Sequence, residues 1–346
     1  IKTLALNKEY SLSGNIKNIN FNESASINID IKTLSNIRML SNLESIDTIT
    51  DYYPDLKFLN NTGSLNYKIL LGNKKSKEYS LYLKDKIKES LKLITSYHTE
   101  IFPIRKKCYQ NLTPVILNNQ QLEIPVYSHS GITGRTKIIS GYNFLTMKKD
   151  KRRLIKSVSG NYLVEVDFKS CEPFFYLLSN SFQLNHVKDV YTWIAKKYNV
   201  KIKSRDKFKR GILSMLYGAN EYTISKVMQI KESEVKKIKK ELGIDCLNDR
   251  LKKEYDENGF ILNYYGRPIT SNNNLVNYWI QSSAVDFCSL AFFDFYKKYN
   301  LKPCFFIHDS MTFEIEKNSF EKIKNISTIK EPKTNIDIPV EFNVIS

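Results

Sequence analysis

The sequence predicts an α+β protein with more than one lobe. Residues 160–178 begin with an alternating run of β-forming residues, and 303–315 contains two such runs around a short turn. Between these regions, residues 187–257 show helical periodicity almost throughout. A chain of 346 residues is long enough to bury a substantial core. Separate strand and helix regions in one chain of this length favour the α+β class.

Composition points to a nucleic-acid partner. The chain has 53 Lys and Arg residues against 36 Asp and Glu, a net charge of +17. An AT-rich genome explains part of the Lys content but not the shortage of acids. The five cysteines are widely spaced without a C-x-x-C pair, so we expect neither a zinc site nor disulfides, and an intracellular, reducing compartment fits best. We find no apolar run of membrane-spanning length and no signal peptide, so no membrane association is expected.

The first 75 residues show no recognisable chemistry. Residues 26–31 alternate as a strand would, but the role of 1–75 is unknown. Residues 76–100 are expected to form an amphipathic helix, with a Lys-rich face that is either solvated or laid along a nucleic-acid backbone. The prolines within 101–130 indicate a connector with short strands.

A turn-rich segment follows at residues 130–137. Gly131 and Gly134 stand beside Arg135 and Lys137, and glycines next to cations allow a backbone to approach a phosphate or base edge closely. An isolated turn of this kind is ordinary, so its meaning depends on the motifs around it.

The first acidic candidate is Asp167. Residues 162–168 predict a strand with Asp167 near its end, and Pro173 fits the first turn of a following helix. A strand end followed by a tight turn fixes a carboxylate and leaves it open to a metal ion. Most Asp residues at strand ends are loop or capping residues, so this one needs partners elsewhere in the chain.

A cationic helix face is predicted at residues 205–218. Arg205, Lys209, Leu213 and Tyr217 are spaced by four and therefore share one face. Such a face could hold a triphosphate with its cations and cover a base with its ring. Gly218 is a plausible C-terminal cap. Without context, an ordinary amphipathic helix explains the same pattern.

The second acidic candidate is Asp309. Two β-rich runs around residues 308–310 predict a hairpin with Asp309 at its tip. Before it, residues 259–268 are expected to form a strand and a turn, and 274–299 a long helix. A helix from about 318 and a strand at 338–345 are expected to close the chain.

Together these pieces predict nucleotidyl transfer. Two metals held by carboxylates about 4 Å apart are the usual device for in-line displacement at phosphorus. One metal lowers the pKa of an attacking hydroxyl, and the other neutralises charge on the leaving pyrophosphate. Mg²⁺ prefers a few carboxylates plus substrate phosphates. A cationic helix face lies between the two acids in sequence, which fits template-directed nucleotide addition.

In order and spacing, the motifs resemble those of the family-A DNA polymerases. The run Asp167-Phe168-Lys169-Ser170-Cys171-Glu172 resembles the first motif, Asp-Tyr-Ser-Gln-Ile-Glu. The second, R-x3-K-x7-YG, is matched from Arg205 to Gly218, and Phe306-Ile307-His308-Asp309-Ser310 resembles the third, Val-His-Asp-Glu. Secondary signatures extend the resemblance over about 125–346: Thr133-Gly134-Arg135-Thr136, Asp189-Val190-Tyr191-Thr192, Gly259 to Arg267, Asn277-x3-Gln281-x4-Asp286 and Ile338-Pro339-Val340-Glu341-Phe342.

The resemblance implies a right-hand polymerase fold with an antiparallel-sheet palm, helical fingers and a helical thumb. It divides the chain into an N-terminal segment of unknown role (1–75), a thumb-like helical region and connector (76–130), a first part of the palm (131–186), the fingers (187–258) and a second part of the palm (259–346). The implied partners are primer–template DNA, dNTPs and accessory replication proteins. The chain itself is expected to be a monomer, and its compact, AT-rich character suggests a phage or a mobile element.

The resemblance also implies roles for the matched residues. The metal ligands would be Asp167, Asp309 and the backbone carbonyl of Phe168, holding two Mg²⁺ ions for which Mn²⁺ can substitute. The nucleotide would be contacted by Glu172, Tyr191, Arg205, Lys209, Leu213 and Tyr217. A 2′-hydroxyl would be obstructed by Glu172 together with Tyr217. The DNA would be contacted by Arg135, Lys137, Asn277, Gln281 and His308.

Departures from the family pattern leave alternatives open. Ser310 stands where the family has Glu, and His-Asp-Ser also occurs in single-subunit phage RNA polymerases. A primase-like or RNA polymerase is therefore the alternative to a DNA polymerase. Glu172 argues against it, because those RNA polymerases resemble Gly at that position. A third interpretation is a non-catalytic nucleic-acid-binding relic, against which the retained acids and cations count.

The segment before residue 120 is expected to be too short for a thumb plus a proofreading domain, and it shows no convincing Asp-x-Glu exonuclease start. We therefore predict no 3′–5′ exonuclease activity in this chain. A labelled primer incubated with pure protein and no dNTPs should keep its length, as resolved by denaturing electrophoresis. Progressive shortening would contradict the prediction.

Overall fold

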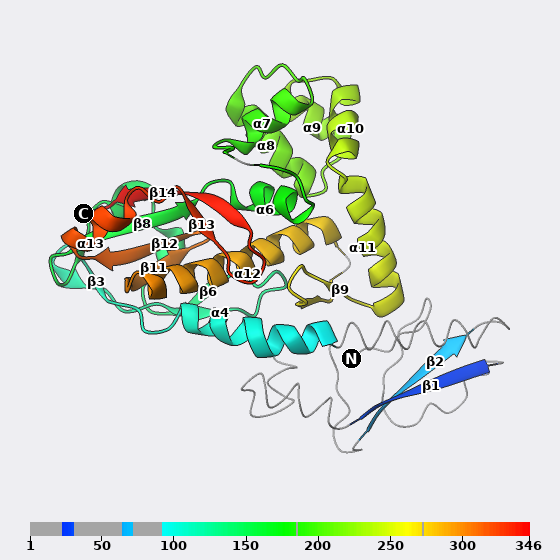
Figure 1. Cartoon of the computed structure of the whole chain (residues 1–346), viewed down its shortest axis with the longest axis horizontal. Helices are drawn as coiled ribbons and strands as arrows, with labels where there is room; N and C mark the ends of the chain where they lie inside the picture. Colours follow the sequence, from blue (N-terminus) through cyan, green and yellow to red (C-terminus); the bar gives the residue numbers. More distant parts are fainter. Residues whose placement is uncertain (1–22, 31–63, 72–91, 185, 272) are drawn as a thin grey trace. The chain divides into compact units, whose positions relative to one another are not determined.

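The computed structural model describes residues 23–30, 64–71, 92–184, 186–271 and 273–346. It divides the chain into two compact units, one of residues 1–103 with 246–279 and the other of 104–245 with 280–346. Figure 1 shows the elements of both units. Among the described helices, none is long and apolar enough to cross a membrane.

The first unit combines segments that are far apart in sequence. Its elements are β1 (Glu23–Asp30), β2 (Ser64–Leu71), the π-helical η1 (Tyr97–Ile101), most of α11 (Ile244–Asn258), β9 (Ile261–Leu262) and β10 (Pro268–Ile269). β1 and β2 pair antiparallel, which confirms the strand expected at 26–31. Of the helix expected at 76–100, residues up to 91 lie outside the described residues, and 92–96 are helical.

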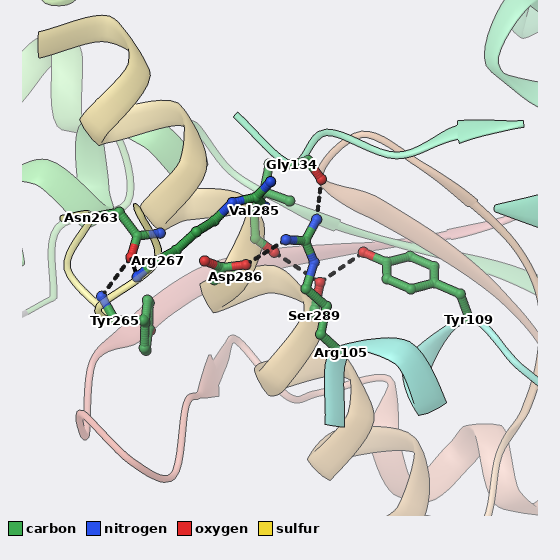
Figure 2. Close-up of polar contacts among 9 residues, drawn as sticks. All are labelled: Arg105, Tyr109, Gly134, Asn263, Tyr265, Arg267, Val285, Asp286 and Ser289. Atoms are coloured by element: carbon green, nitrogen blue, oxygen red, sulfur yellow. Dashed lines mark hydrogen bonds and ion pairs between the residues drawn. The ribbon is translucent and has the colours of Figure 1, made fainter. Parts of the chain in front are cut away.

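A tight turn connects β9 and β10, which pair as an antiparallel hairpin. The Asn263 side-chain oxygen accepts from the backbone N–H groups of Tyr265 and Arg267, each at 2.9 Å (Figure 2). Gly266 has φ +86°, and a Cβ there would lie 2.5 Å from the Leu93 backbone oxygen. Only glycine fits this turn without strain. The strand and turn expected at 259–268 are therefore confirmed.

The second unit is built on a five-stranded antiparallel sheet. Its strands, in spatial order, are β11 (Lys302–Ile307), β12 (Ser310–Ile315), β8 (Tyr162–Phe168), β14 (Asp337–Val344) and β13 (Thr328–Lys330). β8 lies at the centre and coincides with the predicted strand at 162–168. The β11–β12 hairpin is also confirmed, whereas β13 was not predicted.

Alternation along β8 gives the sheet an apolar face and a polar face. Val164, Val166 and Phe168 are buried on the apolar face. There Phe168 packs against Phe287 and Phe292 of α12 (Leu275–Lys298), with ring centroids 5.3 and 4.7 Å apart. Asp167 therefore points to the opposite, polar face.

Helices fill the chain between the two strand regions. They are α6 (Cys171–Ser179), α7 (Val190–Lys197), α8 (Arg205–Leu216), α9 (Glu221–Met228) and α10 (Glu232–Glu241). Asp189, Ser204 and Asn220 cap α7, α8 and α9 by accepting backbone N–H groups. These caps explain why the helical pattern of 187–242 is broken into short helices.

Smaller elements surround the sheet. They are α4 (Phe102–Cys108), β3 (Val115–Leu117), β4 (Gln120–Gln121), β5 (Val126–Ser128), β6 (Lys137–Ser140), the 3₁₀ turn η2 (Phe144–Thr146), α5 (Lys149–Arg152), β7 (Ile155–Ser157) and α13 (Lys317–Ile323). The connector expected at 101–130 is corrected at its start, because 102–108 is helical. Pro103 lies inside an unbroken helical run of residues 92–108, directly after the π-helical η1, and a local π turn is a usual adjustment where a proline interrupts the helical hydrogen bonds.

Candidate active site

One cavity of about 560 Å³ in the second unit brings together most of the predicted site residues. Its walls come from the end of β8, the start of α6, α7, α8 and the β11–β12 turn. The predicted residues on these walls are Arg135, Asp167, Phe168, Glu172, Tyr191, Arg205, Lys209, Leu213, Tyr217 and Asp309. Residues that are up to 174 positions apart therefore share one cavity.

The two acids lie close together because the end of β8 and the β11–β12 turn lie at the same end of neighbouring strands. Asp167 lies opposite Ser310 of β12. Asp309 lies in the β11–β12 turn, where His308 has φ +56°. The backbone N–H of Phe168 donates to the backbone oxygen of Asp309 at 3.1 Å, which ties the end of β8 to that turn.

Both carboxyl groups are electrostatically strained. Burial, followed by the charges of Asp309 and Glu165, raises the pKa of Asp167 to about 7. Burial also raises the pKa of Asp309 to about 6, with a smaller contribution from Glu172 and an opposing one from its own backbone N–H. Neighbouring carboxylates in a partly buried site repel each other, and a divalent cation between them removes that repulsion.

This donor set fits magnesium. Mg²⁺ takes one or two carboxylates and fills its remaining positions with water and substrate phosphates. In the described part of the chain, no cluster of three or more His, Cys, Asp or Glu side chains forms a metal cage. Asp167 and Asp309 with an adjoining cavity are the arrangement that a substrate-sharing Mg²⁺ site requires.

Ser310 belongs to a polar network beside the acids and does not line the cavity. Its hydroxyl oxygen lies 3.0 Å from the backbone oxygen of Ile307 and 3.3 Å from Glu165 Oε1, and its one hydrogen is shared between these two acceptors. Arg152 Nη1 donates to the same Glu165 oxygen at 2.9 Å. The Ser310 hydroxyl therefore fixes the β11–β12 turn.

The cationic helix face is confirmed as part of α8. Arg205, Lys209 and Leu213 line the cavity from this helix, and Tyr217 is its C-cap. Gly218 follows at φ +81° and donates its N–H to Met215 at 3.2 Å, as expected of a helix-ending glycine.

Arg205 is ion-paired on the cavity wall. Its Nε donates to Asp189 Oδ2 at 2.7 Å, and its Nη2 donates to Oδ1 at 3.1 Å. Burial opposes ionisation of Asp189, but hydrogen bonds from Arg205 and Thr192 lower its pKa below the ordinary value. The Tyr191 ring lies 5.6 Å from the Arg205 guanidinium carbon and 5.9 Å from Lys209 Nζ, so it supports both cations.

The Glu172 carboxylate is held by both oxygens. Arg135 Nη2 donates to Oε1 at 3.0 Å, and the Tyr217 hydroxyl donates to Oε2. Burial, followed by the charge of Glu172, raises the pKa of Tyr217, so this hydroxyl stays protonated. A carboxylate anchored on both sides cannot swing away from the cavity.

The predicted DNA-contact residues are only partly brought together. Arg135 and His308 line a second cavity of about 60 Å³ next to Asp309. Lys137 is exposed on β6, and Gln281 is half-buried on α12. In the described part of the chain, neither of these two lines either cavity. Asn277 lies on α12 in the other unit.

Comparison with known proteins supplies the family. Residues 145–345, more than half of the chain, match the model for DNA polymerase family A. The chain belongs to DNA polymerase family A. No curated protein matches it.

A family-A polymerase is also found among similar solved structures. The "POL domain of Pol1 from M. smegmatis complex with DNA primer-template and dNTP" is 13% identical, with a TM-score of 0.45. The match covers 91% of this chain and 63% of that one. Identity and TM-score are too low for this likeness to decide the fold or the function.

In this family-A chain, a fully buried ion pair lies next to Gly134 (Figure 2). Arg105 Nη1 donates to Asp286 Oδ1 at 2.7 Å, and both side chains are 0% exposed. Arg105 Nη2 also donates to the backbone oxygen of Gly134. The pair therefore fixes Gly134, the residue directly before Arg135, and connects α4 to α12.

Sequence reasoning missed several residues of the site. Lys169, Lys188 and Glu341 line the larger cavity without having been assigned a role. Glu341 lies directly opposite Asp167, across the β14–β8 pair. The strand at 338–345 was expected, but its register against β8 depends on long-range pairing that no local pattern reveals.

Replacing Asp286 with Asn should lower the free energy of unfolding by about 3–5 kcal/mol, because the buried Arg105 charge would lose the counter-charge of Asp286. Urea denaturation followed by circular dichroism measures the change. Glu321→Gln is the matched control. It removes a carboxylate from the exposed Lys324–Glu321 pair, and its effect should stay below about 1 kcal/mol. Equal effects of the two changes would contradict the prediction.

Proposed function

We propose that this chain is a DNA-templated DNA polymerase that adds dNTPs to a primer 3′ end by two-metal nucleotidyl transfer. The observation that supports it most is a single cavity lined by two mutually repelling carboxylates, two helix-borne cations and an anchored glutamate. Family membership supports the same reaction class. We also propose that the chain has no proofreading activity, which rests on its sequence alone.

The carboxylates of Asp167 and Asp309, with the backbone carbonyl of Phe168, would hold two Mg²⁺ ions. When bound, such ions lower the pKa of an attacking hydroxyl and neutralise charge on leaving pyrophosphate. The DNA-contact residues would place the primer 3′ hydroxyl beside the two acids.

Binding of the nucleotide would be shared between helix α8 and the start of α6. Arg205 and Lys209 would bind the triphosphate, and the Tyr191 ring lies next to both of their cationic groups. Tyr217 would lie against the nascent base pair, and Leu213 would complete the wall. Glu172 would obstruct a 2′-hydroxyl, because both of its oxygens are already bound to Arg135 and Tyr217.

In this proposal the five-stranded sheet is the palm, α7–α10 are the fingers and the helical region up to α4 is part of the thumb. The duplex would be contacted by Arg135, Lys137, Asn277, Gln281 and His308. An excess of 17 positive charges favours a polyanion, and such binding should weaken steeply with added salt.

Replacing Asp309 with Ala should abolish primer extension, because a single carboxylate cannot hold the metal pair, while binding of primer–template is retained. Extension of a labelled primer and a binding titration at fixed salt measure the two properties. Asp337→Asn is the matched control, since Asp337 is exposed on the same sheet and bonds Thr328. Extension that survives Asp309→Ala would reject the two-metal assignment.

Replacing Glu172 with Ala should raise incorporation of NTPs relative to dNTPs by about tenfold or more, since one removed steric conflict is worth roughly 1–3 kcal/mol. Competing single-nucleotide extensions measure the ratio. Tyr217→Phe removes one of the two anchors and should give a smaller rise. An unaltered protein that uses NTPs as well as dNTPs would instead favour the RNA polymerase alternative.

A further inference from the structure

The cation that the proposed function assigns to a triphosphate is already bound to an internal anion. Asp189 takes Nε and Nη2 of Arg205 in a two-point contact, at 2.7 and 3.1 Å. Both residues line the 560 Å³ cavity. Their side chains are 52% and 27% exposed, so a ligand in the cavity can reach the pair.

Asp189 is fixed in place independently of Arg205. As the N-cap of α7, its carboxylate accepts the Tyr191 backbone N–H at 3.1 Å and the Thr192 hydroxyl at 2.7 Å. It therefore does not move with the arginine. When a ligand takes Arg205, the arginine side chain must leave a stationary carboxylate.

A carboxylate and a phosphate compete for the same donors of an arginine, because both accept two parallel N–H groups from the planar guanidinium. A polyphosphate in the cavity would also experience the negative charge of Asp189 at close range. Both effects act in the same direction, against the ligand.

We propose that Asp189 is an affinity-determining residue of this site: an internal anion that occupies Arg205 and that an incoming polyphosphate must displace. The inference rests on the proposed function of Arg205. The apparent affinity of every ligand that uses Arg205 is the intrinsic affinity multiplied by the fraction of protein in which the Arg205–Asp189 pair is open. Ligands that bypass Arg205 are unaffected by the pair.

Measuring the affinity for inorganic tripolyphosphate by isothermal titration calorimetry, with a chelator present, tests this inference. Asp189→Asn should bind about twofold to fivefold more tightly, which is the range that exposed ion pairs span. Asn is as good an N-cap as Asp, so α7 keeps its start. Asp189→Ser, another uncharged N-cap, should give the same direction.

Asp206→Asn is the matched control for charge alone. Asp206 is exposed, adjoins Arg205 in sequence and has no contact that the proposal uses. Its loss should change the affinity less than Asp189→Asn does. Equal gains from the two changes would mean that bulk electrostatics, and not displacement of a partner, sets the affinity.

A double substitution separates this inference from the proposed function. If Arg205→Gln weakens tripolyphosphate binding and also removes the gain from Asp189→Asn, the two residues are coupled as proposed. If Arg205→Gln weakens binding but Asp189→Asn leaves it unchanged or weakens it, the displacement model is wrong and Asp189 instead positions the arginine. If Arg205→Gln has no effect, the role of Arg205 in the proposed function fails as well.

Discussion

The carboxylates of Asp167 and Asp309, two like charges in one partly buried cavity, set the main physical constraint on this protein. Burial raises the pKa of both Asp167 and Asp309, helped by the charge of Asp309 at Asp167 and by that of Glu172 at Asp309, so the two charged carboxylates are costly to hold together. The cost is offset on the other side of the same strand, where Phe168 packs against two rings of α12. A central strand, hydrogen-bonded on both edges, gives the acids little freedom to separate. Packing on the apolar face of the sheet thus offsets the electrostatic cost of holding the two carboxylates on its polar face.

Arginines around the cavity show a second regularity. Arg205, Arg135 and Arg152 each bind a carboxylate of the protein itself: Asp189, Glu172 and Glu165. A chain with a large excess of cations therefore does not leave these arginines free to bind any passing anion. Their guanidinium groups are held in defined directions, and part of the charge that a polyanionic substrate meets is already neutralised.

Local patterns in the sequence were sufficient for the elements that hold the chemistry. The strand at 162–168, the hairpin turn at Asp309 and the helix beginning at Arg205 follow from alternation, from a turn between two β-rich runs and from four-residue spacing. What the sequence could not supply depends on pairing between distant segments. The register that sets Glu341 opposite Asp167, the strand β13 and the partnership of Arg205 with Asp189 are of this kind. The family resemblance ordered the motifs but did not reveal these contacts.

The attachment of the helices α7–α10 has a consequence for how the protein can change. Tyr176 of α6 accepts the Asn180 side-chain amide at its backbone oxygen, and its hydroxyl donates to the Leu242 carbonyl at 2.7 Å. Asn180 and Leu242, at the two ends of the α7–α10 segment, are therefore both held by Tyr176 of α6. A segment whose ends meet can be lengthened, shortened or exchanged at a small cost in loop-closure entropy. The length and sequence of these helices can therefore change while the strand that holds Asp167 stays the same.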